Sequence, residues 1–287
     1  METSLGRIIA REGMLLAPGV YDALSAKLAR QAGFEAMFIS GYSVAASHLG
    51  VPDIGLLTQT EVIDAARRVC RSVDCPVIVD ADTGYGSVVN VVRTVKELVA
   101  AGAKGCFLED QVWPKRCGHM KGKKVVPLEE HAGRIRAAVD ARGSADFFIV
   151  ARTDAREATG SLDDAIARAR AYKAAGADGL FVEAPQSRAE LERISRELEP
   201  PYVANMLEGG VTPLLTREEL ASLGFRIAVF PLSGLFAAAR AMKEVFAHLK
   251  EKGTTSDIVD RLLTFHDFHQ VVDLAAYHSL DERYRGR

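Results

Sequence analysis

One short pattern recurs along the chain where a helical stretch meets an apolar run. At Gly33, Gly102, Gly176 and Gly224 a helical stretch ends, and a short apolar run begins two or three residues later. Glycine is common at helix ends because it adopts the left-handed conformation without steric cost. Runs that are too short for a helix and apolar on both faces are typical of buried parallel strands. The repeat therefore predicts that helices alternate with buried strands.

The number and spacing of the apolar runs decide between fold classes. Eight runs can be counted, at 14–17, 36–39, 77–79, 105–108, 147–150, 179–182, 202–204 and 227–230. Amphipathic stretches such as 61–71 and 162–175 separate them. This alternation predicts an α/β fold of the (β/α)8 TIM-barrel class, with residues 1–252 as one catalytic domain. A doubly wound sheet is the alternative, but no glycine-rich dinucleotide fingerprint follows the first run.

The residues after the eighth repeat exceed what a barrel requires. A turn at Gly253 opens a second predicted segment, 253–287, which has a helical pattern and apolar residues at Leu262, Phe265, Phe268 and Val271. A surplus amphipathic helix needs another surface for its apolar face. We therefore expect a helical tail that packs on a partner subunit or caps the barrel.

Composition excludes several classes of protein. The chain has 287 residues, of which 48% are hydrophobic and 26% charged, so it can bury a core and is not disordered. A net charge of −2 argues against a nucleic-acid partner, which requires a basic surface. The first residues are charged where a secretory signal is apolar, no run approaches the ~20 apolar residues that span a membrane, and the four cysteines lack zinc-finger or disulfide-scaffold spacing. We expect a cytoplasmic protein with reduced thiols and no membrane partner.

Carboxylates gather at the predicted strand ends, where the active sites of barrels lie. Asp80 and Asp82 end the third strand and Glu109 ends the fourth. Like charges that cluster repel one another unless a cation neutralises them. With no histidine at these positions, the set favours Mg²⁺ or Mn²⁺, which prefer oxygen ligands and keep several waters. Such a metal could hold a 2-oxo or 2-hydroxy acid, whose carboxylate could also meet Ser40, the amides near Gly41, or Arg152.

A long cationic segment, 113–124, follows the fourth strand. It contains two glycines and is expected to act as a lid over the site. Cys117 lies among Lys115, Arg116 and His119, and neighbouring cations lower the pKa of a thiol. The cationic surroundings of Cys117 therefore predict that it acts as an acid/base residue. The alternative is that it is an incidental loop thiol. The other cysteines, Cys70, Cys75 and Cys106, are expected to be packing residues.

The motifs together resemble the lyase branch of the isocitrate lyase/phosphoenolpyruvate mutase superfamily. The resemblance covers nearly the whole chain. It rests on DADTGYG (80–86), LEDQ (108–111), KRCGH (115–119), ARTDA (151–155), NMLEGG (205–210) and PLSG (231–234). KRCGH is the most specific of these and is typical of the lyases.

The resemblance implies roles for particular residues. Asp80 would contact Mg²⁺ directly, whereas Asp53, Asp82 and Glu109 would act largely through its waters. Cys117 would be the acid/base residue, with Arg152, His119 and Tyr42 as further catalytic candidates. The residues expected to bind substrate are Ser40, Gly41, Tyr42, Asp80, Gly118, His119, Arg152, Glu183, Asn205, Leu207, Pro231 and Phe236. The resemblance also implies a homotetramer whose C-terminal helices are swapped between subunits.

Two apolar positions bear on the substrate. Methylisocitrate lyases place an arginine where this chain has Phe236, and a polar run where it has Met206 and Leu207. Both differences remove partners for a third carboxylate. A tricarboxylate is therefore disfavoured, and the resemblance to the members of the family that cleave 2-alkylmalates implies cleavage of such a substrate to a 2-oxo acid such as pyruvate and a carboxylate, with Cys117 protonating the departing fragment. The base for the C2 hydroxyl stays open between Tyr42 and a water on the metal. The alternatives are a phosphonate mutase, oxaloacetate decarboxylation and methylisocitrate cleavage.

Overall fold

Eight parallel strands form a barrel in the computed structural model, which describes residues 3–11 and 14–285. Residues 1–2, 12–13 and 286–287, which belong to the two predicted domains, lie outside the described residues. The strands are β1 (Leu15–Val20), β2 (Met37–Ile39), β3 (Val77–Asp80), β4 (Gly105–Glu109), β5 (Phe148–Thr153), β6 (Gly179–Val182), β7 (Val203–Asn205) and β8 (Ile227–Phe230). Each predicted apolar run contains or overlaps one of them, so the (β/α)8 prediction is confirmed.

The strand order closes the sheet on itself. Neighbours follow the order β6-β5-β4-β3-β2-β1-β8-β7, and every pairing is parallel. The two end strands meet through a parallel bridge between Leu180 and Tyr202, where the Leu180 amide donates to the Pro201 carbonyl at 3.0 Å. Because all strands run the same way, all their carboxyl ends lie at one rim of the barrel.

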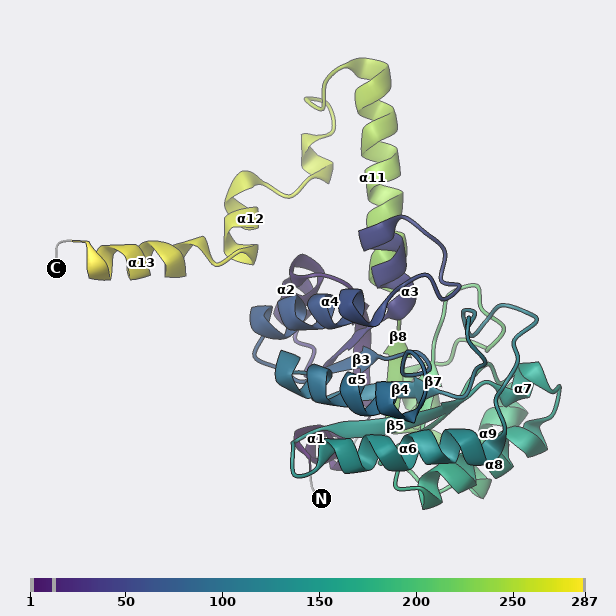
Figure 1. The fold of residues 1–287 in the computed structure, drawn as a ribbon. Helices are drawn as coiled ribbons and strands as arrows, with labels where there is room; N and C mark the ends of the chain where they lie inside the picture. The colour runs from purple at the N-terminus through teal and green to yellow at the C-terminus, as the bar shows by residue number, and fades with distance from the viewer. Residues whose placement is uncertain (1–2, 12–13, 286–287) are drawn as a thin grey trace.

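Helices surround the strands (Figure 1). Their ends follow local sequence rules: Thr58 and Glu61 form a capping box at the start of α4, and Gly102 ends α5 with φ 96°. The helices over the barrel are α1 (Ser4–Ala10), α2 (Ala23–Gln31), α3 (Gly41–Val44), the π-helix η1 (Ala45–Leu49), α4 (Gln59–Ser72), α5 (Val88–Ala101), α6 (Leu128–Arg142), α7 (Ala155–Ala158), α8 (Leu162–Ala174), α9 (Arg188–Glu197) and α10 (Arg217–Ser222).

Aromatic side chains fill the barrel interior. The rings of Phe38 and Phe107 lie 4.8 Å apart, and Phe107 meets Phe181 edge-on at 5.5 Å. Leu5 and Ile9 of α1 belong to the same buried cluster, so α1 covers the amino-terminal end of the barrel. The site is therefore expected at the opposite rim, where the carboxyl ends of the strands lie.

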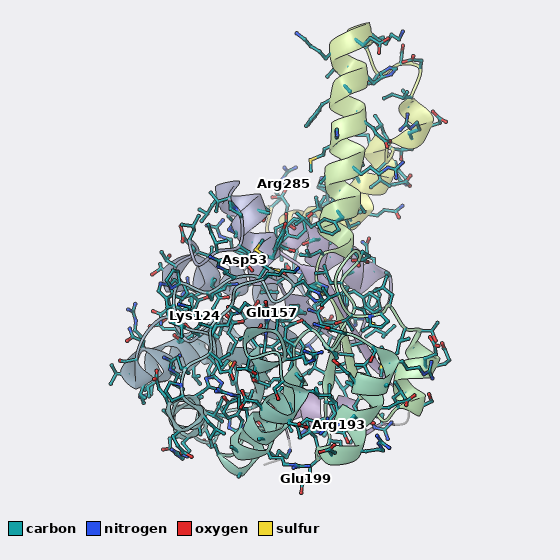
Figure 2. All side chains as sticks on the ribbon, turned by 90° about the vertical axis from the view of Figure 1, so that its right-hand side faces the viewer. Asp53, Lys124, Glu157, Arg193, Glu199 and Arg285 are labelled. Atoms are coloured by element: carbon teal, nitrogen blue, oxygen red, sulfur yellow. The ribbon has the colours of Figure 1, made fainter. Side chains whose placement is uncertain are left out.

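The C-terminal elements leave the barrel. They comprise α11 (Ser233–Lys252), the 3-10 turn η2 (Val259–Arg261), α12 (Phe265–Val271) and α13 (Leu274–Tyr284). Figures 1 and 2 show α11 rising beyond the barrel, and none of its side chains is buried. Large apolar side chains of α11 and the tail are exposed, including Phe246 at 64% and Phe265 at 81%. The helical character of the tail is thus observed, whereas the division into domains at 252/253 and the swap between subunits stay predictions.

An ion pair and a hydrogen bond join the tail to α2 of the barrel within the described part of the chain. Lys27 of α2 forms an ion pair with Asp273, and the Gln31 side-chain amide donates to the Gln270 carbonyl at 3.3 Å. Within residues 3–11 and 14–285, no helix is both long and apolar enough to cross a membrane.

Candidate active site

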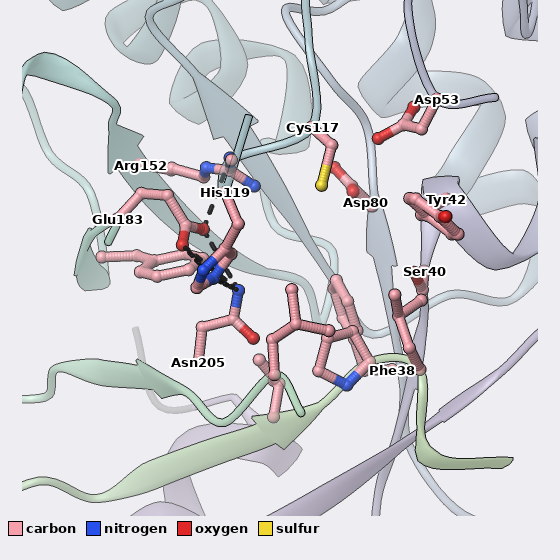
Figure 3. A pocket seen from close by; sticks show the side chains of 16 residues that line it. Phe38, Ser40, Tyr42, Asp53, Asp80, Cys117, His119, Arg152, Glu183 and Asn205 are labelled. Atoms are coloured by element: carbon pink, nitrogen blue, oxygen red, sulfur yellow. Dashed lines mark hydrogen bonds and ion pairs between the residues drawn. The ribbon is translucent and has the colours of Figure 1, made fainter. Parts of the chain in front are cut away.

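A pocket opens at the rim where the strands end. The lid, residues 113–124, covers part of it and leaves only about 40 Å³ of space for water. The pocket is lined by Phe38, Ser40, Tyr42, Asp53, Asp80, Cys117, Gly118, His119, Arg152, Phe181, Glu183, Asn205, Leu207, Val229, Pro231 and Leu232. Figure 3 shows the Cys117 thiol between two polar groups, with Arg152, His119 and Glu183 on one side and Asp80, Asp53 and Tyr42 on the other.

Most residues expected at the site line this pocket, but three expected residues lie behind its wall. Asp82 and Glu109 are buried next to Asp80 without lining the pocket, with exposed fractions of 1% and 2%. Gly41 begins α3, and its amide donates to Asp80 Oδ2 at 3.4 Å. That amide therefore supports the Asp80 carboxylate, and the expected contact of the amides near Gly41 with a substrate carboxylate stays a prediction.

The structure does not bring Phe236 to the pocket. Phe236 lies one turn into α11, is 41% exposed, and donates its amide to the Leu232 carbonyl at 2.8 Å. Leu232 precedes the helix and lines the pocket in its place. The helix directs position 236 outward, so the expected outer apolar wall is formed by Leu207, Val229 and Leu232.

The carboxylate cluster receives a cation from the lid. Lys115 Nζ lies 2.5 Å from Asp53 Oδ1 and 2.8 Å from Asp82 Oδ1, and the lysine side chain is only 3% exposed. Burial raises the pKa of Asp82 to about 7, against the lowering effect of the Lys115 ammonium. Burial likewise raises the pKa of Glu109 well above its usual value. Both carboxyl groups are therefore protonated more readily than usual, and a further cation beside them would stabilise their charged forms.

These carboxylates fit a hard divalent cation. Asp82 Oδ2 and Glu109 Oε1 are buried and accept no hydrogen bond within the described part of the chain. In that same part, no group of three His, Cys, Asp or Glu side chains is arranged to hold a metal ion directly. Mg²⁺ usually takes only one or two carboxylates and keeps several waters. The cluster therefore fits a divalent cation that keeps several waters, whereas the direct contact of Asp80 and the water-mediated roles of Asp53, Asp82 and Glu109 stay predictions.

Arg152 organises the opposite side of the pocket. Its Nη2 lies 3.3 Å from Glu109 Oε2 and 3.4 Å from Glu183 Oε2, and its guanidinium carbon is 5.2 Å from the centre of the Phe181 ring. Although burial alone would raise it, the pKa of Glu183 falls to about 2 because Arg152 and His119 stabilise the carboxylate. The Asn205 amide donates to Glu183 Oε1 at 3.2 Å.

The tip of the lid, residues 117–119, packs directly on the Arg152 side of the pocket. His119 Nε2 lies 3.1 Å from Glu183 Oε1, and its Nδ1 accepts the Val211 amide at 3.0 Å. A methyl group on Gly118 would lie 2.4 Å from Arg152 Nη2 and 2.6 Å from Glu183 Cδ, so only glycine fits. Residue 118 therefore brings the lid backbone into contact with the substrate-facing groups.

The expected lowering of the Cys117 pKa is wrong. Burial raises the pKa of the thiol to about 11. The neighbouring Lys115 ammonium is directed to Asp53 and Asp82, so little of its charge acts on the sulfur. At neutral pH Cys117 is consequently a protonated thiol, which suits a proton donor better than a base.

The sequence analysis assigned no role to Asp154 and Asp110, two buried carboxylates that support Arg152. Asp154 binds Arg152 Nε through Oδ2 at 2.9 Å, and its amide donates to Asp110 Oδ1 at 2.9 Å. Asp110 also accepts the Thr153 hydroxyl at 2.7 Å and the Tyr172 hydroxyl at 2.8 Å. Asp110 and Asp154 directly follow β4 and β5, and this position was the signal that could have identified them.

The fold and pocket define an enzyme built on a (β/α)8 barrel with a carboxylate cluster and a cysteine lid. The family model described as phosphoenolpyruvate phosphomutase matches residues 5–250. The chain belongs to this family of carbon–carbon lyases and phosphomutases, the phosphoenolpyruvate mutase/isocitrate lyase superfamily, as its motifs indicated.

Individual relatives differ in the reactions that their names describe. The chloroplastic carboxyvinyl-carboxyphosphonate phosphorylmutase of Arabidopsis thaliana is 52% identical, over 99% of this chain and 85% of its own. The 2,3-dimethylmalate lyase of Eubacterium barkeri is 44% identical over 96% of both chains. A solved oxaloacetate acetylhydrolase, in complex with 3,3-difluorooxalacetate, has a TM-score of 0.93 at 35% identity and covers 99% of this chain and 96% of its own.

One solved relative contains a metal. A phosphonopyruvate hydrolase structure holds oxalate and Mg²⁺, with a TM-score of 0.84, 29% identity and 94% of each chain covered. A divalent ion is thus found in a relative of the same fold, as expected for a metal-dependent superfamily.

Proposed function

We propose that this protein is a magnesium-dependent carbon–carbon lyase that cleaves a 2-hydroxy dicarboxylate of the 2-alkylmalate type. The products are a 2-oxo acid such as pyruvate and a carboxylate. The observation that carries the proposal is the position of Cys117, a protonated thiol inside the pocket between the Asp80 side and the Arg152 side. Such a thiol can protonate a carbanion that leaves one half of the substrate while the other half stays bound.

The residues on the two sides of the pocket would bind different halves of the substrate. Mg²⁺, when bound, would stabilise negative charge on the oxygens of the 2-oxo acid half. Ser40 and Tyr42 lie on that side, and Tyr42 is the candidate base for the C2 hydroxyl. Arg152 would hold a substrate carboxylate on the other side. Lid closure excludes water, so that the Cys117 proton reaches the departing carbon first.

The wall chemistry favours a small alkyl group over a third carboxylate. Leu207, Val229 and Leu232 provide no charged partner. An unpaired carboxylate buried there would lose its hydration without compensation. We therefore expect 2-alkylmalates to exceed 2-methylisocitrate at least ~30-fold in kcat/KM, which corresponds to about 2 kcal/mol.

A substrate panel tests this function. The purified protein is assayed with Mg²⁺ for 2-oxo acid release from 2,3-dimethylmalate, 2-methylmalate, 2-methylisocitrate and oxaloacetate. Conversion of phosphonopyruvate to phosphoenolpyruvate is followed separately by phosphorus NMR. Cleavage of the alkylmalates with the stated preference supports the lyase. A phosphonate mutase is the second candidate, because the Arabidopsis relative with that name is 52% identical. Turnover of phosphonopyruvate alone would replace the lyase by this candidate, and equal activity on methylisocitrate would contradict our view of the pocket wall.

We further propose that the exposed tail mediates a homotetramer. Val271 is buried, but large apolar side chains of α11 to α13 such as Phe246, Phe265 and Tyr277 are 64–81% exposed, and a second copy of the chain would bury them. The mass in solution, measured by light scattering, should equal four chains, and a chain ending at Gly253 should give a smaller assembly. A full-length monomer would contradict this proposal.

A further inference from the structure

The lid contains a lysine whose side chain is completely buried. Lys123 has a side-chain exposure of 0%, whereas Lys121 and Lys124 of the same lid are exposed. Lys123 Nζ lies 2.8 Å from Asp154 Oδ1 and also donates to the Gly118 carbonyl. A buried ammonium is costly unless it is paired and hydrogen-bonded, so these two contacts help to fix the position of the lid, together with those of Lys115 and His119.

The partner of Lys123 is the carboxylate that supports Arg152. Asp154 Oδ1 also accepts Arg152 Nη2 at 3.0 Å, so the lid lysine and the arginine share one oxygen. Arg152 Nη2 further faces Glu109 and Glu183 at 3.3 and 3.4 Å. One guanidinium thus faces three carboxylates, and without Lys123 little of its charge would remain for an anionic substrate.

The same ammonium also holds the lid tip. The Gly118 carbonyl that it binds belongs to the residue packed on Arg152 and Glu183. Cys117 and His119 flank that glycine on either side. A single side chain therefore connects the position of the lid, the orientation of its tip and the charge around Arg152.

We propose that Lys123 is a positioning residue that docks the lid and, by sharing the charge of Asp154, leaves Arg152 able to bind the substrate carboxylate. The inference rests on the proposed binding role of Arg152 and not on which substrate bond is broken. Binding and lid accessibility can therefore test it even if the lyase assignment fails.

The first experiment compares Lys123→Met with Lys121→Met and Lys124→Met, which remove an exposed lysine from the same lid. The affinity for oxalate is measured by calorimetry with Mg²⁺, and the rate of tryptic cleavage after Arg116 is measured without ligand. We expect Lys123→Met to weaken oxalate binding at least tenfold and to accelerate cleavage at least fivefold, with both controls within twofold of wild type. Wild-type values for Lys123→Met in both measurements would overturn the proposal.

A second comparison separates the charge effect from packing. Lys123→Met is introduced into an Asp154→Asn background, in which the shared carboxylate is gone. If Lys123 acts through Asp154, the added substitution should weaken oxalate binding less than threefold relative to Asp154→Asn alone. An equal loss in both backgrounds would assign Lys123 a packing role only and would overturn the charge coupling. Should Lys123→Met alone fail to fold, as judged by circular dichroism, the neutral pair still provides this test.

Discussion

Replacement of Asp80 by alanine is expected to abolish turnover, with kcat/KM falling at least ~1,000-fold, about 4 kcal/mol of transition-state stabilisation. Asp80 and Asp53 are the carboxylates of the cluster that line the pocket, and Asp53 is already paired with Lys115, whereas Asp82 and Glu109 lie behind the wall. Without Asp80, the remaining carboxylates could hold a metal only through waters or at a displaced position. The assay is 2-oxo acid release from the best substrate of the panel, at saturating Mg²⁺.

Two controls accompany this measurement. Asp64→Ala removes a carboxylate from the outer surface of α4 and should retain wild-type activity, because Asp64 only pairs with neighbouring arginines. Circular dichroism should show that Asp80→Ala keeps its fold. Wild-type protein treated exhaustively with EDTA should also be inactive and recover with Mg²⁺ or Mn²⁺. Full activity after that treatment would refute the metal hypothesis.

Replacement of Cys117 by serine is expected to lower kcat at least ~100-fold on an alkylmalate, within the usual range for losing a general acid. The hydroxyl keeps the shape of the thiol but is a much weaker acid, so proton transfer to carbon becomes limiting. KM should change little, because Arg152 and Asp80 remain. If oxaloacetate is decarboxylated, that reaction should suffer less, since water can protonate the smaller product.

The pH dependence of the activity and a control substitution at a second cysteine make this test more specific. Because burial raises the pKa of Cys117 to about 11, the thiol stays protonated between pH 7 and 9, and its ionisation should cause no loss of activity there. Cys75→Ser, at a half-buried thiol outside the pocket, should behave like wild type. Wild-type rates for Cys117→Ser on both kinds of substrate would reduce Cys117 to a loop thiol and remove the main support for the lyase.

The strands and the rim chemistry were predictable because both depend on local patterns. A short run that is apolar on both faces, as at 77–79 in β3, is typical of a buried strand, and glycine ends helices for backbone reasons alone. Parallel strands place all their carboxyl ends together. A polar residue at the end of a strand, such as Asn205, or directly after it, such as Glu183, could therefore be assigned to one pocket without knowing any distance.

Tertiary structure decided which charged groups in the site pair with one another and where the side chains point. The lid lysines appear equivalent in the sequence, yet packing exposes Lys124 and buries Lys123 against Asp154. The Cys117 pKa rises because desolvation outweighs cations that other carboxylates already hold. Position 236 turns away because α11 starts just before it. The sequence by itself determined the barrel and the set of groups at its rim, since these follow from periodicity and strand direction. Only the folded chain decided which charges pair, because desolvation and Coulomb energies depend on distances between residues far apart in sequence.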